Sequence, residues 1–115
     1  MAGARGEATI QAGEREVHIL FTNRALAEVE TRLKQSIIGV AQGFADGTAG
    51  VTELVHLLRA GMEAARREAR EGGRVSLNEA FEVLDEAGFT AVTMAVMDAV
   101  SAVLSFGTAD QDPNA

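Results

Sequence analysis

Apolar and polar residues alternate in the first part of the chain. Two runs, from Ala8 to Ala12 and from Arg15 to Phe21, are separated by the turn-forming pair Gly13 and Glu14, and the second run is rich in β-branched residues. Alternation with a period of two, interrupted by a short turn, predicts a β-hairpin.

Beyond the hairpin, apolar residues recur every three or four positions, which is the period of an amphipathic helix. A first helix is expected after Thr22, whose hydroxyl can cap it, and a second over residues 36–45. A third is expected to start at Thr52, also a capping residue, and to stop at Gly72-Gly73.

Two further helices are expected in the second half of the chain. Ser76 followed by Glu79 predicts a capping box, and Gly88 stands where a left-handed residue would end that helix. Its expected apolar face consists of Leu77, Ala80, Phe81, Leu84 and Ala87. The last helix is expected over residues 90–106.

At 115 residues the chain is the size of one domain. The patterns predict an α+β fold with a small N-terminal β-hairpin followed by about five helices in one mainly helical domain, residues 8–106. Residues 1–7 are expected to form a flexible N-terminus and residues 107–115 a disordered polar tail.

Composition narrows the classes of function. The chain has no cysteine, which excludes disulfides and thiolate metal sites, and its formal net charge is −7, which disfavours nucleic acid as a partner. The opening residues do not form a secretory signal, so a cytoplasmic location is expected. Residues 91–106 are too short to span a membrane and carry Asp98 in their middle, so no membrane contact is expected.

The sequence predicts no catalytic, cofactor or metal site, and therefore no enzyme. His18 and His56 have no acidic or histidine neighbours at ligand spacing, and no glycine motif that would hold a phosphate is present. The one basic concentration consists of Arg59, Arg66, Arg67, Arg70 and Arg74. Because glutamates interrupt it and no aromatic is interleaved, we interpret it as a solvated helix face and not as a nucleic-acid surface.

The last helix contains the candidate partner-binding residues. On a helical wheel Val92, Val96 and Val100 belong to a core-facing arc, whereas the large apolar residues Met94, Met97 and Leu104 fall on the opposite arc. Either another element of the chain covers these three residues, or they form a contact surface for self-association or for a partner chain.

Several short motifs together resemble one family, the phage tail assembly chaperones that include the gene transfer agent members. The motifs are Arg5-Gly6-Glu7, Phe21-Thr22-Asn23 with Leu26 and Glu30, Ala60-Gly61, and Leu77-Asn78-Glu79 leading to Leu84-Asp85-Glu86-Ala87-Gly88. They extend over most of the chain, from about Arg5 to Leu104. The segment from Glu63 to Val75 is longer than the family's usual connection.

The resemblance implies a non-catalytic protein that binds the tape measure protein and promotes polymerisation of the major tail tube protein around it, without remaining in the particle. It also implies a homo-oligomer in the bacterial host cytoplasm. The alternative is a small structural virion component, a head–tail connector or a tail terminator. A nucleic-acid-binding regulator is a third possibility, which the charge disfavours.

Overall fold

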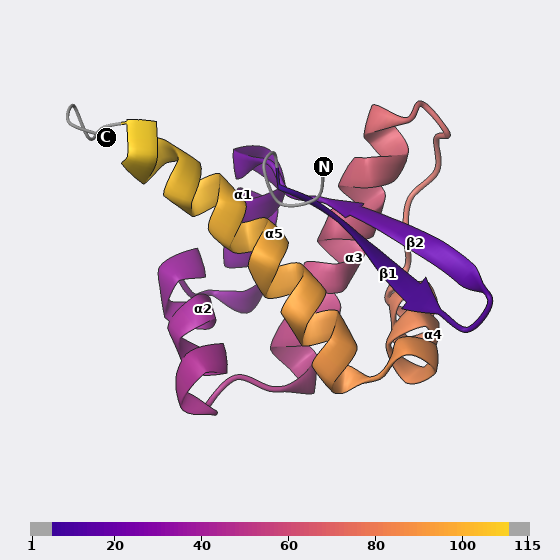
Figure 1. Ribbon diagram of the computed structural model, residues 1–115, viewed down its shortest axis with the longest axis horizontal. Helices are drawn as coiled ribbons and strands as arrows, with labels where there is room; N and C mark the ends of the chain where they lie inside the picture. Colours follow the sequence, from indigo (N-terminus) through magenta and orange to yellow (C-terminus); the bar gives the residue numbers. More distant parts are fainter. Residues whose placement is uncertain (1–5, 111–115) are drawn as a thin grey trace.

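The computed structural model describes residues 6–110, with side chains described as far as residue 104. A two-stranded antiparallel sheet, β1 (Glu7–Ala12) and β2 (Arg15–Leu20), opens the fold. Five helices follow it in this part of the chain: α1 (Asn23–Leu33), α2 (Ile37–Asp46), α3 (Val51–Glu68), α4 (Leu77–Ala87) and α5 (Phe89–Asp110). The predicted α+β architecture is confirmed (Figure 1).

The hairpin has one buried face and one exposed face. Ala8 pairs with Ile19 and Ile10 pairs with Val17, and all four side chains are buried, whereas their neighbours Thr9 and His18 are exposed. The alternating sequence produces this division because successive strand residues point to opposite faces.

The hairpin begins earlier than the sequence predicted. Glu7 is already in β1, and the carbonyl of Gly6 accepts a hydrogen bond of 2.7 Å from the amide of Phe21. Residues 6 and 7 therefore belong to the folded domain and not to a flexible N-terminus. Residues 1–5 lie outside the described part of the chain.

Hydroxyl groups cap three helices. The Thr22 hydroxyl accepts from the Ala25 amide at 3.1 Å, the Ser36 hydroxyl from the Gly39 amide at 2.9 Å, and the Ser76 hydroxyl from the Glu79 amide at 3.1 Å. Each bond satisfies an amide that has no partner within its helix. These caps confirm the expected starts of α1 and α4 and place the start of α2 at Ile37.

The predicted ends of α3 are both wrong. Gly50, not Thr52, is the N-cap, and its amide donates to the Glu53 carboxylate at 2.8 Å. The helix ends at Glu68, well before Gly72, because Arg70 adopts a left-handed conformation with φ of 60°. The amides of residues 70 and 71 then donate back to the carbonyls of residues 67 and 66, which is a Schellman motif with arginine in the usual glycine position.

Two expectations for α4 also need correction. The Glu79 carboxylate does not complete a capping box, because it forms a salt bridge with Arg66 of α3. The apolar face is shifted as well: Val83 is fully buried together with Ala80, whereas Leu77 and Phe81 are 37% and 39% exposed. Small residues at positions 80 and 83 allow α4 to pack closely, and this packing leaves the larger side chains outside.

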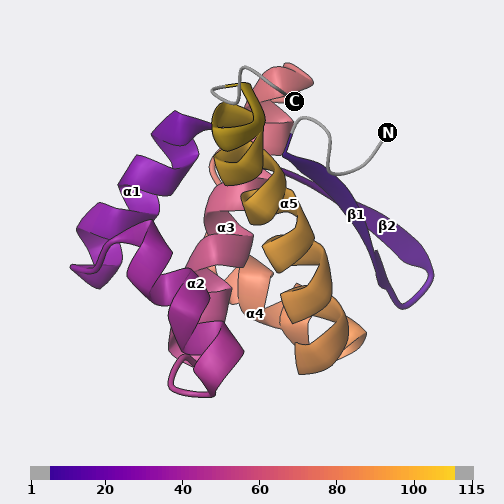
Figure 2. The ribbon, with the colours of Figure 1, turned by 60° about the vertical axis from the view of Figure 1, so that its left-hand side comes forward.

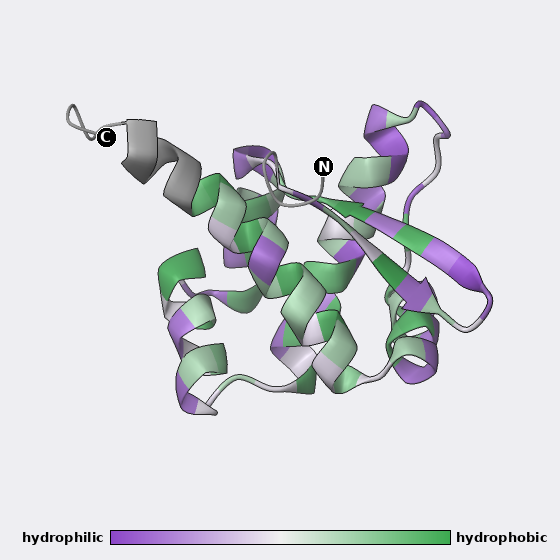
Figure 3. Cartoon of the chain, viewed as in Figure 1, coloured by the Kyte–Doolittle hydropathy of each residue, from purple (hydrophilic) through white to green (hydrophobic). Residues whose placement is uncertain are grey.

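Helix α3 lies at the centre of the molecule, between the pair α1 and α2 on one side and the hairpin on the other (Figures 1 and 2). Its Leu54, Leu57 and Leu58 are completely buried. Burial of a leucine side chain contributes about 1.5–3 kcal/mol, so this helix supplies a large part of the stabilising free energy. Apolar residues, coloured green, recur along α5 and also on both strands, on α4 and on the first turn of α2 (Figure 3).

Helix α5 extends further than expected at both ends. It begins at Phe89 and continues through residues 107–110, which the sequence assigned to the polar tail; residues 111–115 lie outside the described chain. Within the described residues, no single helix is both long and apolar enough to cross a membrane. α4 and α5 satisfy length and apolar character only as a pair, which is bent by 113°.

Candidate partner-binding surface

The structure separates the three candidate residues of α5. Met94 is 64% exposed, as the helical wheel predicted. Met97 and Leu104 are instead partly buried and pack against the core. Of the two alternatives, coverage by other elements of the chain holds in part for Met97 and Leu104, whereas Met94 is exposed, so the three residues do not form one fully exposed stripe.

Five further exposed apolar residues were missed as surface candidates: Ile38 and Val51, each 50% exposed, and Leu77, Phe81 and Phe89. Leu77 and Phe81 lie one helical turn apart and hence on the same side of α4, and Phe89, at the start of α5, is 43% exposed. A wheel of α4 alone places Leu77 and Phe81 beside Leu84, which is buried, so the wheel predicted them to be core. The signal that would have distinguished them is the adjacent stripe of Ala80, Val83 and Ala87, whose small side chains favour close helix packing.

A buried ionic cluster joins α3 to the segment that precedes α4. Arg59 is only 6% exposed, which corrects its assignment to a solvated face. One carboxylate oxygen of Glu63 accepts from the Arg59 guanidinium at 3.2 Å and from the Val75 amide at 2.9 Å. A second bond of 3.5 Å connects the same guanidinium to the Val75 carbonyl. Burying this charge is tolerated because it is paired and hydrogen-bonded.

The electrostatic environment of the cluster is positive. The hydrogen bond from Val75 is the largest cause of the lowered pKa of Glu63; burial opposes it, and the nearby arginines reinforce it. Burial is the largest cause of the lowered pKa of His56, with the charges of Arg32 and Arg59 adding to it. Some polar atoms remain unsatisfied: the Arg59 Nε and the His56 Nδ1 are buried without a hydrogen-bond partner in the described structure.

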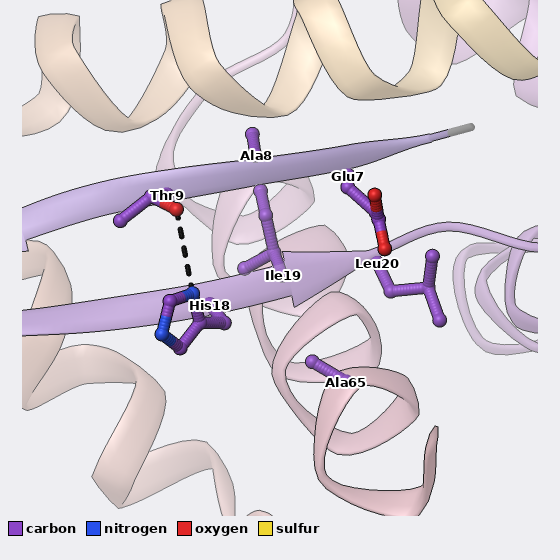
Figure 4. A pocket seen from close by; sticks show the side chains of 7 residues that line it. All are labelled: Glu7, Ala8, Thr9, His18, Ile19, Leu20 and Ala65. Atoms are coloured by element: carbon purple, nitrogen blue, oxygen red, sulfur yellow. Dashed lines mark hydrogen bonds between the residues drawn. The ribbon is translucent and has the colours of Figure 1, made fainter. Parts of the chain in front are cut away.

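A hollow of about 400 Å³ lies beside α3 and is lined by residues of both strands and by Ala65 (Figure 4). Here the Thr9 hydroxyl and the His18 Nδ1 are hydrogen-bonded at 3.3 Å. Both residues are exposed, and among the described residues no carboxylate hydrogen-bonds to the imidazole. A hydroxyl next to an imidazole needs such a third group to act as an oriented nucleophile and base.

Metal-binding groups are also sparse. The described part of the chain contains no group of three or more histidine, aspartate or glutamate side chains that could hold a metal ion.

Comparison of the chain with protein-family models, with curated proteins and with solved structures gives no match in any of the three. Some residues of the motifs that resemble the tail assembly chaperones are buried, such as Phe21 and Leu26, and others, such as Leu77, are exposed. Gly61 of α3, which belongs to the same motifs, is in close contact with β2 and the residue after it: a Cβ there would lie 2.9 Å from the Phe21 ring and 3.1 Å from Ile19.

Proposed function

We propose that this protein is a tail assembly chaperone of a long-tailed phage, a prophage or a gene transfer agent. In this role it binds the tape measure protein in the bacterial host cytoplasm and promotes polymerisation of the major tail tube protein, without catalysis and without a cofactor. The proposal rests on the motif resemblance and on the character of the surface.

The observation that carries the proposal is the set of large apolar side chains exposed on two consecutive helices. Leu77 and Phe81 on α4, and Phe89 and Met94 on α5, are between 37% and 64% exposed. A tape measure protein is expected to be a long helical chain with apolar faces that are uncovered until the tube encloses them. Exposed leucine, phenylalanine and methionine suit the recognition of such helices because their contacts are apolar and adaptable.

The test is co-expression with the tape measure protein of the same phage or gene transfer agent. The tape measure protein is expected to be soluble with this chain and to aggregate without it, because its uncovered apolar faces otherwise associate. The pair Leu77→Ser and Phe81→Ser should reduce the soluble yield of the tape measure protein. Ile38→Ser is the matched control, since Ile38 is also exposed, at 50%, but lies on α2.

Equal solubility of the tape measure protein with and without this chain would contradict the proposal. Mass spectrometry of purified particles tests the alternative: a chaperone is absent from them, whereas a connector or terminator is present in fixed copy number. Size-exclusion chromatography with light scattering checks the expected homo-oligomer.

A further inference from the structure

A groove of about 1030 Å³ runs along the seam between α1 and α3. From α1 it is lined by Arg24, Glu28 and Arg32, which are spaced i, i+4, i+8 and therefore share one helix face. From α3 it is lined by Arg59, Glu63 and Arg67 at the same spacing. The segment that precedes α4, from Gly72 to Ser76, forms the third side together with Leu77, the first residue of α4.

The residues that line the groove carry a net positive charge, whereas the net charge of the whole chain is negative. Five arginines and two glutamates line it, a local formal charge of +3, whereas the whole chain carries −7. Of the five, only Arg59 forms a salt bridge within the described residues. Arg24, Arg32, Arg67 and Arg74 are exposed and present their guanidinium groups without a carboxylate partner there. Such groups bind carboxylates through pairs of parallel hydrogen bonds.

The wall of the groove also contains an unmet hydrogen-bond donor. Arg59 is 6% exposed, and its Nε has no hydrogen-bond partner in the described structure, although its other end is held by Glu63 and Val75. A buried donor without an acceptor is costly, and the residue that carries it lines the groove.

We propose that this groove binds an acidic segment of a partner polypeptide, with carboxylate groups on the arginines and an apolar side chain on Leu77. Leu77 is exposed at the edge of the groove and supplies the apolar contact. The proposal stands apart from the tape measure protein, since any partner with a suitable acidic segment would fit.

The lining favours a polypeptide over other anions. The described lining includes no aromatic side chain for base stacking, and Glu28 and Glu63 would repel the evenly spaced phosphates of a nucleic acid. A single inorganic phosphate would occupy a small fraction of the groove. An acidic peptide can place its carboxylates beside arginines and leave uncharged residues beside the two glutamates.

The test is a titration of the full-length protein with a fluorescent oligoglutamate peptide at low salt, with an oligoglutamine peptide, a single-stranded oligonucleotide and inorganic phosphate as comparisons. The double variant Arg32→Gln and Arg67→Gln should weaken oligoglutamate binding by about tenfold or more. The matched control is Lys34→Gln with Arg70→Gln, which removes the same charge from the ends of the same two helices but outside the groove. It should change the affinity by less than about threefold.

Saturable binding of oligoglutamate that the groove variant abolishes and the control retains supports the proposal. An equal loss in both double variants would overturn it, because binding would then depend on net charge alone. Preference for the oligonucleotide, binding of phosphate but not of the peptide, or no saturation up to about 1 mM peptide would also overturn it.

Discussion

Among the described glycines, Gly6 is the one at which an added Cβ would make the closest contact. Its φ is +79°, and a Cβ there would lie 2.3 Å from the carbonyl oxygen of Phe21 and 2.7 Å from a methyl group of Val103. We therefore expect Gly6→Ala to destabilise the fold. The first contact is with backbone, which cannot rotate away as a side chain can.

The loss of stability can be estimated from the two ways in which the chain can relieve the contact between the added Cβ and Phe21. If residue 6 stays in place, the left-handed conformation alone costs about 1–2 kcal/mol, and the contacts add to it. If residue 6 detaches, the amide of the buried residue Phe21 loses the acceptor it now has at 2.7 Å, which costs about 1–3 kcal/mol. We expect a loss of about 2–3 kcal/mol, or a fall in Tm of about 8–12 °C at about 4 °C per kcal/mol.

Thermal unfolding followed by circular dichroism measures this loss, with Gly13→Ala as the matched control. Gly13 also has a positive φ, of +65°, but a Cβ there meets nothing within 4 Å. Its substitution should therefore lower the Tm by only about 4 °C, from the backbone conformation alone. If Gly6→Ala lowers the Tm no more than Gly13→Ala does, the close contacts with Phe21 and Val103 do not contribute to the loss of stability and the reasoning is refuted.

Three further predictions concern α3 and α5. Arg70→Gly should raise the free energy of unfolding by about 1 kcal/mol, because glycine adopts the left-handed conformation after α3 without strain. Ala69→Gly is the control and should not raise it, because residue 69 is in a right-handed conformation. Chemical denaturation measures both. The pKa of Glu63 is lowered in the folded state, so its contribution is present above the unfolded pKa of about 4.3 and is lost as the pH falls through the folded value. Glu63→Gln should therefore reduce stability at neutral pH and flatten its decline below about pH 4.3, and denaturation midpoints that decline as steeply as in the wild type would contradict this. Met97→Ser should lower the free energy of unfolding by about 1 kcal/mol or more, because Met97 packs against the core. Met94→Ser should change it by no more than about 0.5 kcal/mol, because Met94 is exposed. Similar Tm values for the two variants would show that the packing of Met97 does not contribute to stability.

Local signals in the sequence were sufficient for the hairpin and for most helix starts. Alternation around Gly13 and the hydroxyls of Thr22 and Ser76 act over a few residues, so their outcome does not depend on the rest of the fold. The C-terminal end of α3 was mispredicted because Arg70 adopts a left-handed conformation, in which glycine is the usual residue. Gly72 and Gly73 lie in the loop after α3. Their low helix propensity therefore indicated this loop and not the residue at which the helix ends.

The surface could be predicted only in part, because exposure depends on contacts between distant segments. Arg59 follows a helical pattern that places it with solvated residues, and only the approach of Val75, far along the chain, encloses it. The arginine groove has the same origin: α1 supplies Arg24 and Arg32, which are unremarkable in the sequence until α1 packs beside α3. A long-range contact of this kind produces no periodic pattern in the sequence of either helix.

The contact between Gly6 and Val103 has a consequence for the order of folding. β1 precedes α5 in the chain by the hairpin's second strand and four helices, so it is synthesised well before the helix against which it packs. Until α5 emerges from the ribosome, the apolar face of the hairpin lacks one of its covering helices, and a nascent chain in that state is prone to aggregation. The long sequence separation of this contact also raises the entropic cost of closing the fold. Chains that terminate before α5 should therefore depend on cellular chaperones to remain soluble, even though they contain both strands of the hairpin and the central helix.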